Sequence, residues 1–473
     1  MVMIQDVAPD FPQLKDFLRL IGPDRAARLR AAADTIRERL AGGTLWHVNS
    51  TPAGGGVAEM LHTLLPLYRS LGVRVGWLVL DGDERFFAVT KSLGLALYGT
   101  ADGNSDSAAG LGWRERADYR QTLDGNAKTI SDLVAPNDVV LLHDHQTAGL
   151  VGALSEQVAA VYWRCHIGVD EPTAASESAW EFLAPLLDRA DALLFSVRRH
   201  VPERLREHRV AILPPFISPF AVKNCDLPDD VLATCLARCG LRGPAAAPVR
   251  TTVDTPAGPV ALDRPVRMVT DGPPEPGEPI VAQISRWDRL KDMDGVLTAF
   301  AESGCPGYLA LVGPDPAGIP DDVEQAAWFD RCVRAWHALP RTRRRRVGLI
   351  CLPMAAQAEN AVLVNAIQRA AAVVVQKSLA EGFGLTVTEA MWKSRVVLAS
   401  AVGGIREQIT HGEDGLLVDD PTDRAAFGAL LAATVHGAAD TTAMGTRARN
   451  RVLRDFLPDH EVVTTAELLA GGR

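Results

Sequence analysis

The sequence has 473 residues, of which 47% are hydrophobic, and its 49 Lys and Arg against 58 Asp and Glu give a formal net charge of -9. This length exceeds what one hydrophobic core usually supports, so we expect two or three domains. The negative charge argues against a nucleic-acid binder, because affinity for phosphate backbones comes from Lys and Arg. No run of eighteen apolar residues predicts a membrane helix, and the N-terminal residues lack a signal-peptide pattern.

Seven cysteines are scattered along the chain without the spacing of a metal site, which predicts reduced thiols in a cytoplasmic protein. Two sequence features resemble metal ligands: Asp81 with Asp83, and His143 with His145. A turn at a strand end explains the first pair. Neutral, hydrogen-bonding side chains explain the second, because no third ligand stands at a suitable spacing. We therefore expect no metal site.

The first half of the chain alternates short apolar runs with helical stretches. The expected strands are 45–48, 73–80, 139–144, 158–167, 192–196 and 210–215, and the clearest helical spacing runs over 57–71. Continuous apolar strands separated by helices predict a parallel sheet covered on both faces. We expect residues 1–240 to form one Rossmann-like domain of this α/β class.

The alternation stops at 241–279, a segment rich in Pro, Ala and Gly that predicts a linker or a partly ordered insertion. It then restarts, with strands expected at 280–285, 308–313, 347–353, 371–376, 395–400 and 415–418. Residues 280–453 are thus predicted to form a second doubly wound domain, and the tail 454–473 to pack back on the first. Ligands of such sheets bind at the carboxyl ends of the strands, so we expect the site in a cleft between the two domains.

Three consecutive glycines, Gly54, Gly55 and Gly56, join the first strand to a helix. Glycine permits positive φ and a close backbone approach, and a helix N-terminus attracts anions. A dinucleotide site would use this turn with Asp81 on the ribose, but the spacing G-G-G-V-A-E departs from G-x-G-x-x-G. A tight structural turn is the plain alternative.

The stretch QKSLAEGFGLTVTEAMWKS, residues 376–394, follows a buried strand and carries Glu381 and Glu389 on either side of G-F-G. Gly382 and Gly384 allow a tight turn into a helix whose first N–H groups would face a phosphate. Glu389 could accept hydrogen bonds from a ribose diol and Glu381 from sugar hydroxyls. Either glutamate alone would be an ordinary surface carboxylate, but both together around G-F-G form an uncommon pattern.

A second charged stretch, ISRWDRLKD at 284–292, lies just past the first strand of the second domain. Arg286 and Lys291 could converge on a diphosphate, where cations stabilise the charge of a departing nucleotide. Two basic residues in a loop are otherwise usually solvated.

These motifs carry a resemblance to a known family. E-x7-E, R-x4-K and the N-terminal glycine loop resemble the retaining GT-B glycosyltransferases of family 4. The stretches WHVNSTPAGGGVAEMLHTLLPLYRSLG, HDHQTAGL, WRCHI, VQKSLAEGFGLTVTEAMWK and VGGIREQI are most similar to the trehalose glycosyltransferring synthases within it. The resemblance covers nearly the whole chain except 241–279.

The resemblance implies a GT-B fold, a nucleoside-diphosphate hexose as donor substrate, a small-molecule acceptor and no cofactor. It implies catalytic roles for His166, over the transferred sugar, and for Arg286, Lys291 and Glu381. Donor-binding residues would be Gly54, Gly55, Gly56, Arg286, Lys291, Glu381, Gly382, Phe383, Gly384, Leu385, Thr386 and Glu389. Acceptor-binding residues would be Asn49, Gly55, His143, Asp144, His145, His166 and Gly168. A homodimer is also expected.

The sequence departs from the family pattern on the acceptor side. Gly168 stands where the family has an aspartate, and His145 and Thr147 replace residues of H-D-P-Q-P-A-G-L. Because glycine leaves room and offers no side-chain hydrogen-bond acceptor, we expect weak or absent trehalose formation from free glucose, or a bulkier preferred acceptor, and Gly168→Asp to shift preference toward glucose. The alternatives are another hydroxyl or thiol acceptor, an NAD-dependent oxidoreductase, or a non-catalytic sugar-nucleotide sensor.

Overall fold

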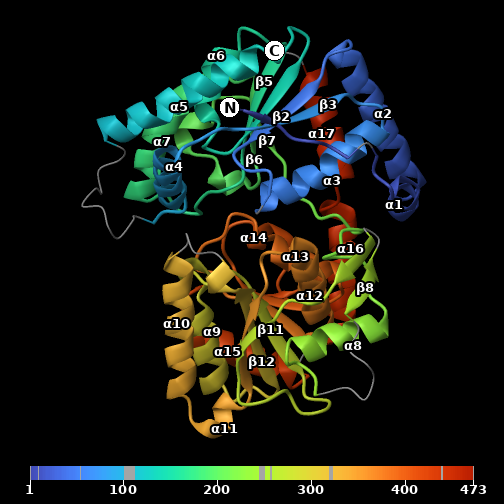
Figure 1. Ribbon diagram of the computed structural model, residues 1–473, viewed down its shortest axis with the longest axis vertical. Coiled ribbons are helices and arrows are strands. Elements are labelled where there is room, and N and C mark those ends of the chain that lie inside the picture. The colour runs from blue at the N-terminus through green and yellow to red at the C-terminus, as the bar shows by residue number, and fades with distance from the viewer. Residues whose placement is uncertain are drawn as a thin grey trace. The chain divides into compact units, whose positions relative to one another are not determined.

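The computed structural model describes residues 2–8, 10–53, 55–100, 112–243, 251–255, 258–318, 323–437 and 440–471. The chain divides into two compact units. The first comprises Met1–Phe216, Glu381–Phe383 and Phe456–Arg473, and the second Ile217–Ala380 and Gly384–Asp455. Each is built around a seven-stranded sheet flanked by helices (Figure 1). None of the helices in the described ranges is long and apolar enough to cross a membrane.

The sheet of the first unit has the strand order β1-β3-β2-β4-β5-β6-β7, in which only β1 runs antiparallel to its neighbour. Its strands are β1 (Met3–Ile4), β2 (Leu45–Asn49), β3 (Val75–Val79), β4 (Val139–His143), β5 (Ala160–Cys165), β6 (Ala192–Phe195) and β7 (Val210–Ile212). The α-helices are α1 (Leu14–Ile21), α2 (Pro23–Leu40), α3 (Gly56–Ser70), α4 (Glu84–Leu97), α5 (Trp113–Ser131), α6 (Val151–Leu154), α7 (Ala174–Leu187) and α17 (Asp459–Ala470).

The core of the first unit explains why these strands read as continuous apolar runs. Residues of β3, β4, β5 and β6 are buried along their whole length, as expected for a parallel sheet with helices on both faces. Trp163, Trp180 and Phe195 pack with ring centroids 6.1–6.3 Å apart, joining β5 and β6 to α7. The predicted parallel sheet is confirmed here.

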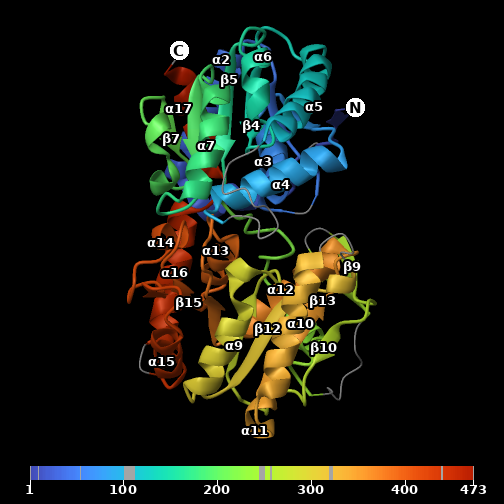
Figure 2. The same ribbon diagram turned by 90° about the vertical axis from the view of Figure 1, so that its left-hand side faces the viewer.

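The sheet of the second unit has the order β10-β13-β12-β11-β14-β15-β16, with β10 antiparallel to β13. Its strands are β10 (Arg267–Val269), β11 (Ile280–Ile284), β12 (Tyr308–Pro314), β13 (Val347–Leu352), β14 (Val373–Gln376), β15 (Val396–Ser400) and β16 (Leu416–Val418). The α-helices are α8 (Asp229–Arg238), α9 (Met293–Glu302), α10 (Val323–Ala338), α11 (Arg341–Arg344), α12 (Gln357–Ala370), α13 (Leu385–Trp392), α14 (Ile405–Gln408), α15 (Arg424–Val435) and α16 (Thr441–Asp455). Figure 2 shows α9 and α10 beside β12 on one face of this sheet.

The units divide at different positions from those the sequence suggested. Residues 217–240 belong with the second unit, because α8 packs on α12 and Asn365 donates hydrogen bonds to the carbonyls of Val222 and Cys225. Of the segment 241–279, residues 244–250 and 256–257 lie outside the described ranges. The described part of it contains the hairpin of β8 (Thr252–Thr255) and β9 (Gly258–Ala261), followed by the edge strand β10.

The C-terminal helix α17 belongs to the first unit and packs along α2 (Figure 1). Two ion pairs hold it there. Arg25 contacts Asp459 at 2.8 Å, and the fully buried Arg164 of β5 contacts Glu461 at 2.5 Å. The packing of this helix is therefore specific, because a buried charge left without its partner is strongly destabilising.

In each unit the strand order reverses at one point: between β2 and β4 in the first, and between β11 and β14 in the second. Chain connections leave such a switch point in opposite directions, so a crevice opens at the carboxyl ends of the two strands. The motifs predicted to bind ligands follow these strands.

Candidate active site

The loop after β2 leads from Asn49 to the glycines. Asn49 is buried, its oxygen accepts a hydrogen bond from Trp77 at 2.8 Å, and its nitrogen donates to the carbonyl of Thr51 at 2.7 Å. Its amide therefore braces the loop. Gly55 has φ +117°, a conformation that favours glycine, and α3 begins at Gly56. Gly54 lies outside the described residues.

The ends of β4 and β5 are joined through Asp144. This residue has φ +62°, and its carboxylate accepts a hydrogen bond from the backbone N–H of His166 at 2.7 Å. Its own N–H donates to the carbonyl of Arg164 at 2.7 Å. Burial raises the pKa of Asp144 to about 6, although the hydrogen bond from His166 and the charge of Arg164 oppose the shift. Asp144 therefore sets the position of the His166 backbone.

His143 and His166 are brought together, and a third histidine joins them. His47 of β2 lies 3.1 Å from His143, which lies 3.1 Å from His166, in each case between ring nitrogens. Burial lowers the pKa of His47 to about 3 and those of His143 and His166 well below the usual value, and the charge of Arg164 adds to each shift. All three imidazoles are thus neutral at pH 7.

His145 does not join this group. It is buried, and its Nε2 donates to the carbonyl of Thr90 in α4 at 2.8 Å. Burial lowers its pKa to about 4. Thr147 is likewise turned inward, with its hydroxyl donating to the carbonyls of His143 and Asp144. Both unusual residues of HDHQTAGL therefore support the backbone behind the site.

The expectation that Gly168 leaves room for a larger acceptor is wrong. A Cβ at this position would lie 2.5 Å from Cγ and 2.7 Å from Nδ1 of His200, so that histidine occupies the space. His200 is buried, and its Nε2 lies 3.5 Å from a carboxylate oxygen of Asp170. Gly168→Asp would therefore require His200 to move before it could affect an acceptor.

The G-F-G turn is divided between the two units. Glu381, Gly382 and Phe383 belong to the first, where Phe383 packs edge-on against Phe456 with centroids 5.6 Å apart. A Cβ at Gly382 would lie only 2.7 Å from the carbonyl oxygen of His166, so glycine is required by this close approach. Glu381 is half-buried in the same unit. The first part of the G-F-G turn therefore packs directly against the backbone of His166.

The loop after β11 carries the two predicted diphosphate ligands in the second unit. Arg286 is exposed, and its guanidinium lies 3.1 Å from the carboxylate of Asp288. Lys291 ends a short 3-10 turn that Asp288 caps by accepting from its N–H at 3.0 Å. The buried Gln283 donates to the Lys291 carbonyl at 2.7 Å. The backbone at Lys291 is therefore fixed from two sides.

A buried ion pair supports the same loop. Lys377, only 1% exposed at the end of β14, contacts the carboxylate of Asp292 and donates to the carbonyl of Pro421 at 2.7 Å. Asp292 directly follows Lys291 and has φ +46°. The backbone N–H of Leu379 also donates to the Leu290 carbonyl at 2.7 Å. The loops after β11 and β14 are thus locked together.

Helix α13 directly follows the G-F-G turn and belongs, with Gly384, to the second unit. Gly384 precedes it with φ +88°, and Leu385 and Thr386 form its first turn. Glu389, in its second turn, is only 5% exposed and lies 3.3 Å from the amine of Lys223. The helix N-terminus offers backbone N–H groups to an anion, and Glu389 a carboxylate one turn deeper.

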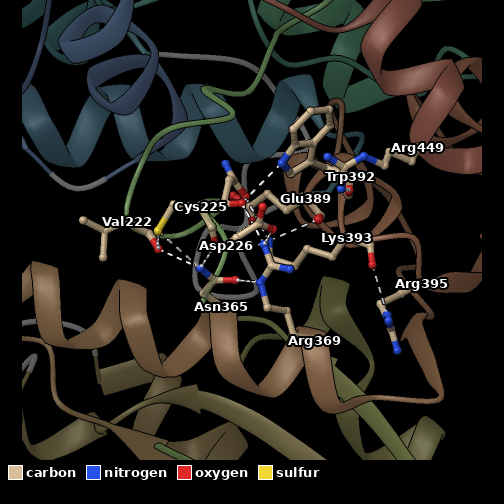
Figure 3. A network of polar contacts seen from close by, with 11 residues as sticks. Val222, Cys225, Asp226, Asn365, Arg369, Glu389, Trp392, Lys393, Arg395 and Arg449 are labelled. Atoms are coloured by element: carbon tan, nitrogen blue, oxygen red, sulfur yellow. Dashed lines mark hydrogen bonds and ion pairs between the residues drawn. The ribbon is translucent and has the colours of Figure 1, made fainter. Parts of the chain in front are cut away.

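Glu389 is part of a larger polar network that fastens the segment 222–226 to α12 and α13 (Figure 3). Lys393 donates to the side chain of Asn224 at 2.9 Å and to the carbonyl of Glu389 at 3.1 Å. Arg369 donates to the Cys225 carbonyl at 2.8 Å. Burial lowers the pKa of Lys393 to about 7, while the charge of Glu389 opposes the shift. The network holds the Glu389 carboxylate in a fixed, partly desolvated position.

Comparison with known proteins identifies the family. The family described as "Trehalose synthase, N-terminal domain" matches residues 47–202, and "Glycosyl transferases group 1" matches residues 357–451. A trehalose synthase of Pyrococcus horikoshii is 32% identical over 94% of this chain and 93% of its own. The chain belongs to the trehalose synthase family. A trehalose synthase of Rubrobacter xylanophilus is also 32% identical, over 96% of each chain.

This membership confirms the predicted family, and with it a hexose-transferring enzyme of the glycosyltransferase class. It sets aside the NAD-dependent oxidoreductase hypothesis.

A solved structure supports the fold. An α,α-trehalose-phosphate synthase (UDP-forming) from Burkholderia vietnamiensis matches with a TM-score of 0.63 at 14% identity, covering 90% of this chain and 98% of its own. At that identity the likeness shows the fold alone, and the GT-B prediction is confirmed.

Several residues of the site escaped the sequence analysis although signals for them exist. His47 is a polar residue inside the apolar strand LWHV, and Lys377 a charged one directly after the apolar run AAVVVQ. A buried polar side chain in a strand needs a partner, which points to a network. The partners themselves carry no local signal: Asp292 lies 85 residues from Lys377, and His143 lies 96 residues from His47.

Proposed function

We propose that this member of the trehalose synthase family transfers glucose from a nucleoside-diphosphate glucose to free glucose, with retention at the anomeric carbon. The bond between the glucosyl C1 and the diphosphate oxygen breaks, a bond from C1 to the acceptor hydroxyl oxygen forms, and the hydroxyl proton leaves with the nucleoside diphosphate or to water. The similarity to proteins named trehalose synthase over nearly the full length of both chains carries this proposal.

Arg286 and Lys291 hold the diphosphate in this proposal, together with the first N–H groups of α13, including those of Leu385 and Thr386. Negative charge gathers on the diphosphate as the bond to C1 breaks, and fixed cations stabilise that charge most in the transition state. The buried supports of the Lys291 backbone favour this role, because a cation that is already positioned needs no reorganisation during the reaction.

Glu381 would bind hydroxyls of the transferred sugar, and Glu389 the ribose diol. Gly382 and Phe383 shape the turn that carries Glu381. His166 would lie against the transferred sugar, positioned by Asp144 and His143. No step in this scheme uses a cofactor, and the catalysis is mainly positioning and charge stabilisation.

The acceptor would bind beside the same histidines and the Gly55 loop. A second candidate function is transfer to a different hydroxyl or thiol acceptor. It is favoured by Gly168, which offers no side-chain oxygen, and by His145 and Thr147, whose side chains bond inward. Because His200 fills the space beside Gly168, the second candidate gains no support from a larger cavity there.

The deciding experiment incubates the purified protein with ADP-, UDP- or GDP-glucose and a panel of acceptors, with glucose, other sugars and thiols tested separately. Trehalose is identified by its two equivalent anomeric carbons in the NMR spectrum and by its lack of a reducing end. Formation of trehalose from glucose with one of the donors is expected. Transfer only to another acceptor would establish the second candidate, and no transfer at all would favour the sugar-nucleotide sensor.

The setting of the enzyme is also a proposal. All seven cysteines lie within the described residues and are free and buried, which supports the reducing cytoplasm as its compartment. A homodimer stays a prediction for which size-exclusion chromatography with light scattering is the measurement.

A further inference from the structure

Three imidazole rings form a hydrogen-bonded row across the switch point of the first unit. His47 Nδ1 lies 3.1 Å from His143 Nε2, and His143 Nδ1 lies 3.1 Å from His166 Nε2. The rings are stacked, with centroids 5.4 Å apart in both pairs. His47 and His143 are each 1% exposed, whereas His166 is half-buried. The row therefore runs from two fully buried strand residues, on β2 and β4, to a partly exposed residue just past the end of β5.

Such a row has two possible directions. A neutral imidazole carries one N–H donor and one bare acceptor nitrogen. In the first direction His47 donates to His143, His143 donates to His166, and His166 carries its proton on Nδ1. In the second direction every bond is reversed, and His166 carries its proton on Nε2. The middle ring, His143, couples the two ends, since it cannot donate or accept at both nitrogens while neutral.

The buried end of the row decides between these directions. Nε2 of His47 is fully buried and has no hydrogen-bond partner among the described residues. In the second direction this nitrogen would carry an unpaired buried N–H, whereas in the first it is a bare nitrogen. A buried N–H without an acceptor is the rarer and costlier of the two.

The charge of Arg164 keeps the row neutral. This guanidinium comes from β5, two residues before His166, is 0% exposed, and acts electrostatically on all three rings, which disfavours a second proton on any of them. Its NH1 is bonded to Glu461. Because each neutral ring carries a single proton, the row must take one of its two directions.

We propose that His47 and His143 are positioning residues that fix His166 in the tautomer with its proton on Nδ1. Nδ1 of His166 has no protein partner in the described part of the chain, and the residue is half-buried where the other two rings are fully buried, so its N–H is available to a ligand. The inference deepens the proposed function, on which it rests for the ligand. His166 would meet the transferred sugar as a hydrogen-bond donor to one of its oxygens, and the direction of the row excludes its meeting the sugar as an acceptor.

The first test does not depend on activity. The protein is labelled with ¹⁵N-histidine, and long-range ¹H–¹⁵N correlation spectra distinguish protonated from bare ring nitrogens. Loss of signals in His166→Gln assigns that ring. We expect a protonated Nδ1 and a bare Nε2 on His166 in the wild-type protein. A protonated Nε2 on His166 would overturn the proposal, whether or not the protein transfers glucose.

The second test removes the start of the row. His47→Asn replaces the ring with an amide whose oxygen can accept a hydrogen bond from Nε2 of His143. The second direction then no longer leaves a buried N–H without an acceptor, so the His166 signals should report a mixture of tautomers. We expect kcat/KM for the nucleotide sugar to fall about tenfold, the scale of one misdirected hydrogen bond. The control is His208→Asn, which changes a histidine of the same unit outside the row and should leave both readouts unchanged.

The outcomes separate the two proposals. A wild-type spectrum with the expected tautomer but no transfer from any donor would refute the proposed function and leave the row intact. Unchanged kinetics and an unchanged His166 tautomer in His47→Asn would refute the positioning role. If His47→Asn does not fold, the wild-type spectrum alone decides the direction.

Discussion

Replacing Lys377 with methionine tests whether the buried ion pair beneath the Lys291 loop matters for both stability and catalysis. The amine of Lys377 contacts the Asp292 carboxylate and the Pro421 carbonyl in a position that is 1% exposed, and methionine fills a similar volume without the charge. The variant leaves Asp292, whose side chain is 17% exposed, without its cation.

The expected loss of stability follows from this burial. Removing one partner of a fully buried pair costs about 3–5 kcal/mol, and we expect about 3 kcal/mol because Asp292 is not completely buried. For a unit of this size that corresponds to a fall of about 6–12 °C in its unfolding temperature. Burial already raises the pKa of Asp292 while Lys377 lowers it, so without Lys377 this pKa rises further. The deficit should shrink as the pH falls, because the folded variant then gains a proton that neutralises Asp292.

The assay combines calorimetry at several pH values with donor kinetics. Because Asp292 follows Lys291 directly, kcat/KM for the nucleotide sugar should fall at least about tenfold, the scale of a displaced catalytic contact. The matched control is Lys377→Met with Asp292→Asn. Asparagine tolerates the positive φ of Asp292 and is uncharged, so about half of the stability should return. If the single variant Lys377→Met has a free energy of unfolding within about 1 kcal/mol of the wild-type value and normal kinetics, the role of the ion pair is refuted.

Further predictions address charge, metal, pH and the acceptor. Arg286→Ala and Lys291→Ala should each lower kcat/KM about 100-fold or more, and near-normal turnover in both would refute the diphosphate assignment. Activity should survive EDTA, because side-chain cations and a helix N-terminus stabilise the leaving diphosphate; loss on chelation that Mg²⁺ or Mn²⁺ restores would contradict this. Burial lowers the pKa of His145 to about 4 in the folded protein, against about 6.5 in the unfolded chain. The contribution of this neutral histidine to the free energy of unfolding, about 3 kcal/mol, is therefore complete above pH 6.5 and is lost as the pH falls toward 4. His145→Gln should flatten the melting profile over that range, and an unchanged slope would refute the assignment. Gly168→Asp should lower the melting temperature, and pairing it with His200→Ala should restore part of the loss, whereas a stable single variant would contradict the close contact.

The sequence predicts the parallel strands well because each is a continuous apolar run. β11 and β14, for example, are recognisable as IVAQI and VVVQ, and the ligand motifs directly follow them. The edges of the sheets are harder to predict. β10, Arg267–Val269, is a three-residue antiparallel strand within a proline-rich segment, and its pairing with β13 depends on residues about 80 positions away.

Side-chain orientation at the site also escapes the sequence. His143 and His145 are two residues apart and alike in type, yet one joins the histidine row and the other bonds to α4. At Gly168 the sequence shows the missing side chain but not the ring of His200, 32 residues later, that replaces it. In both cases the outcome depends on which neighbour the tertiary fold supplies.

The return of α17 to the first unit has a consequence for how the protein matures. During synthesis, β5 and the other strands of the first sheet emerge long before α17, which follows the whole of the second unit. Until then Arg164 has no Glu461, and closing the first core around it would trap a lone cation. We therefore expect the second unit to reach its native state first on the ribosome, while the first stays loosely packed and open to chaperones until the last helix docks.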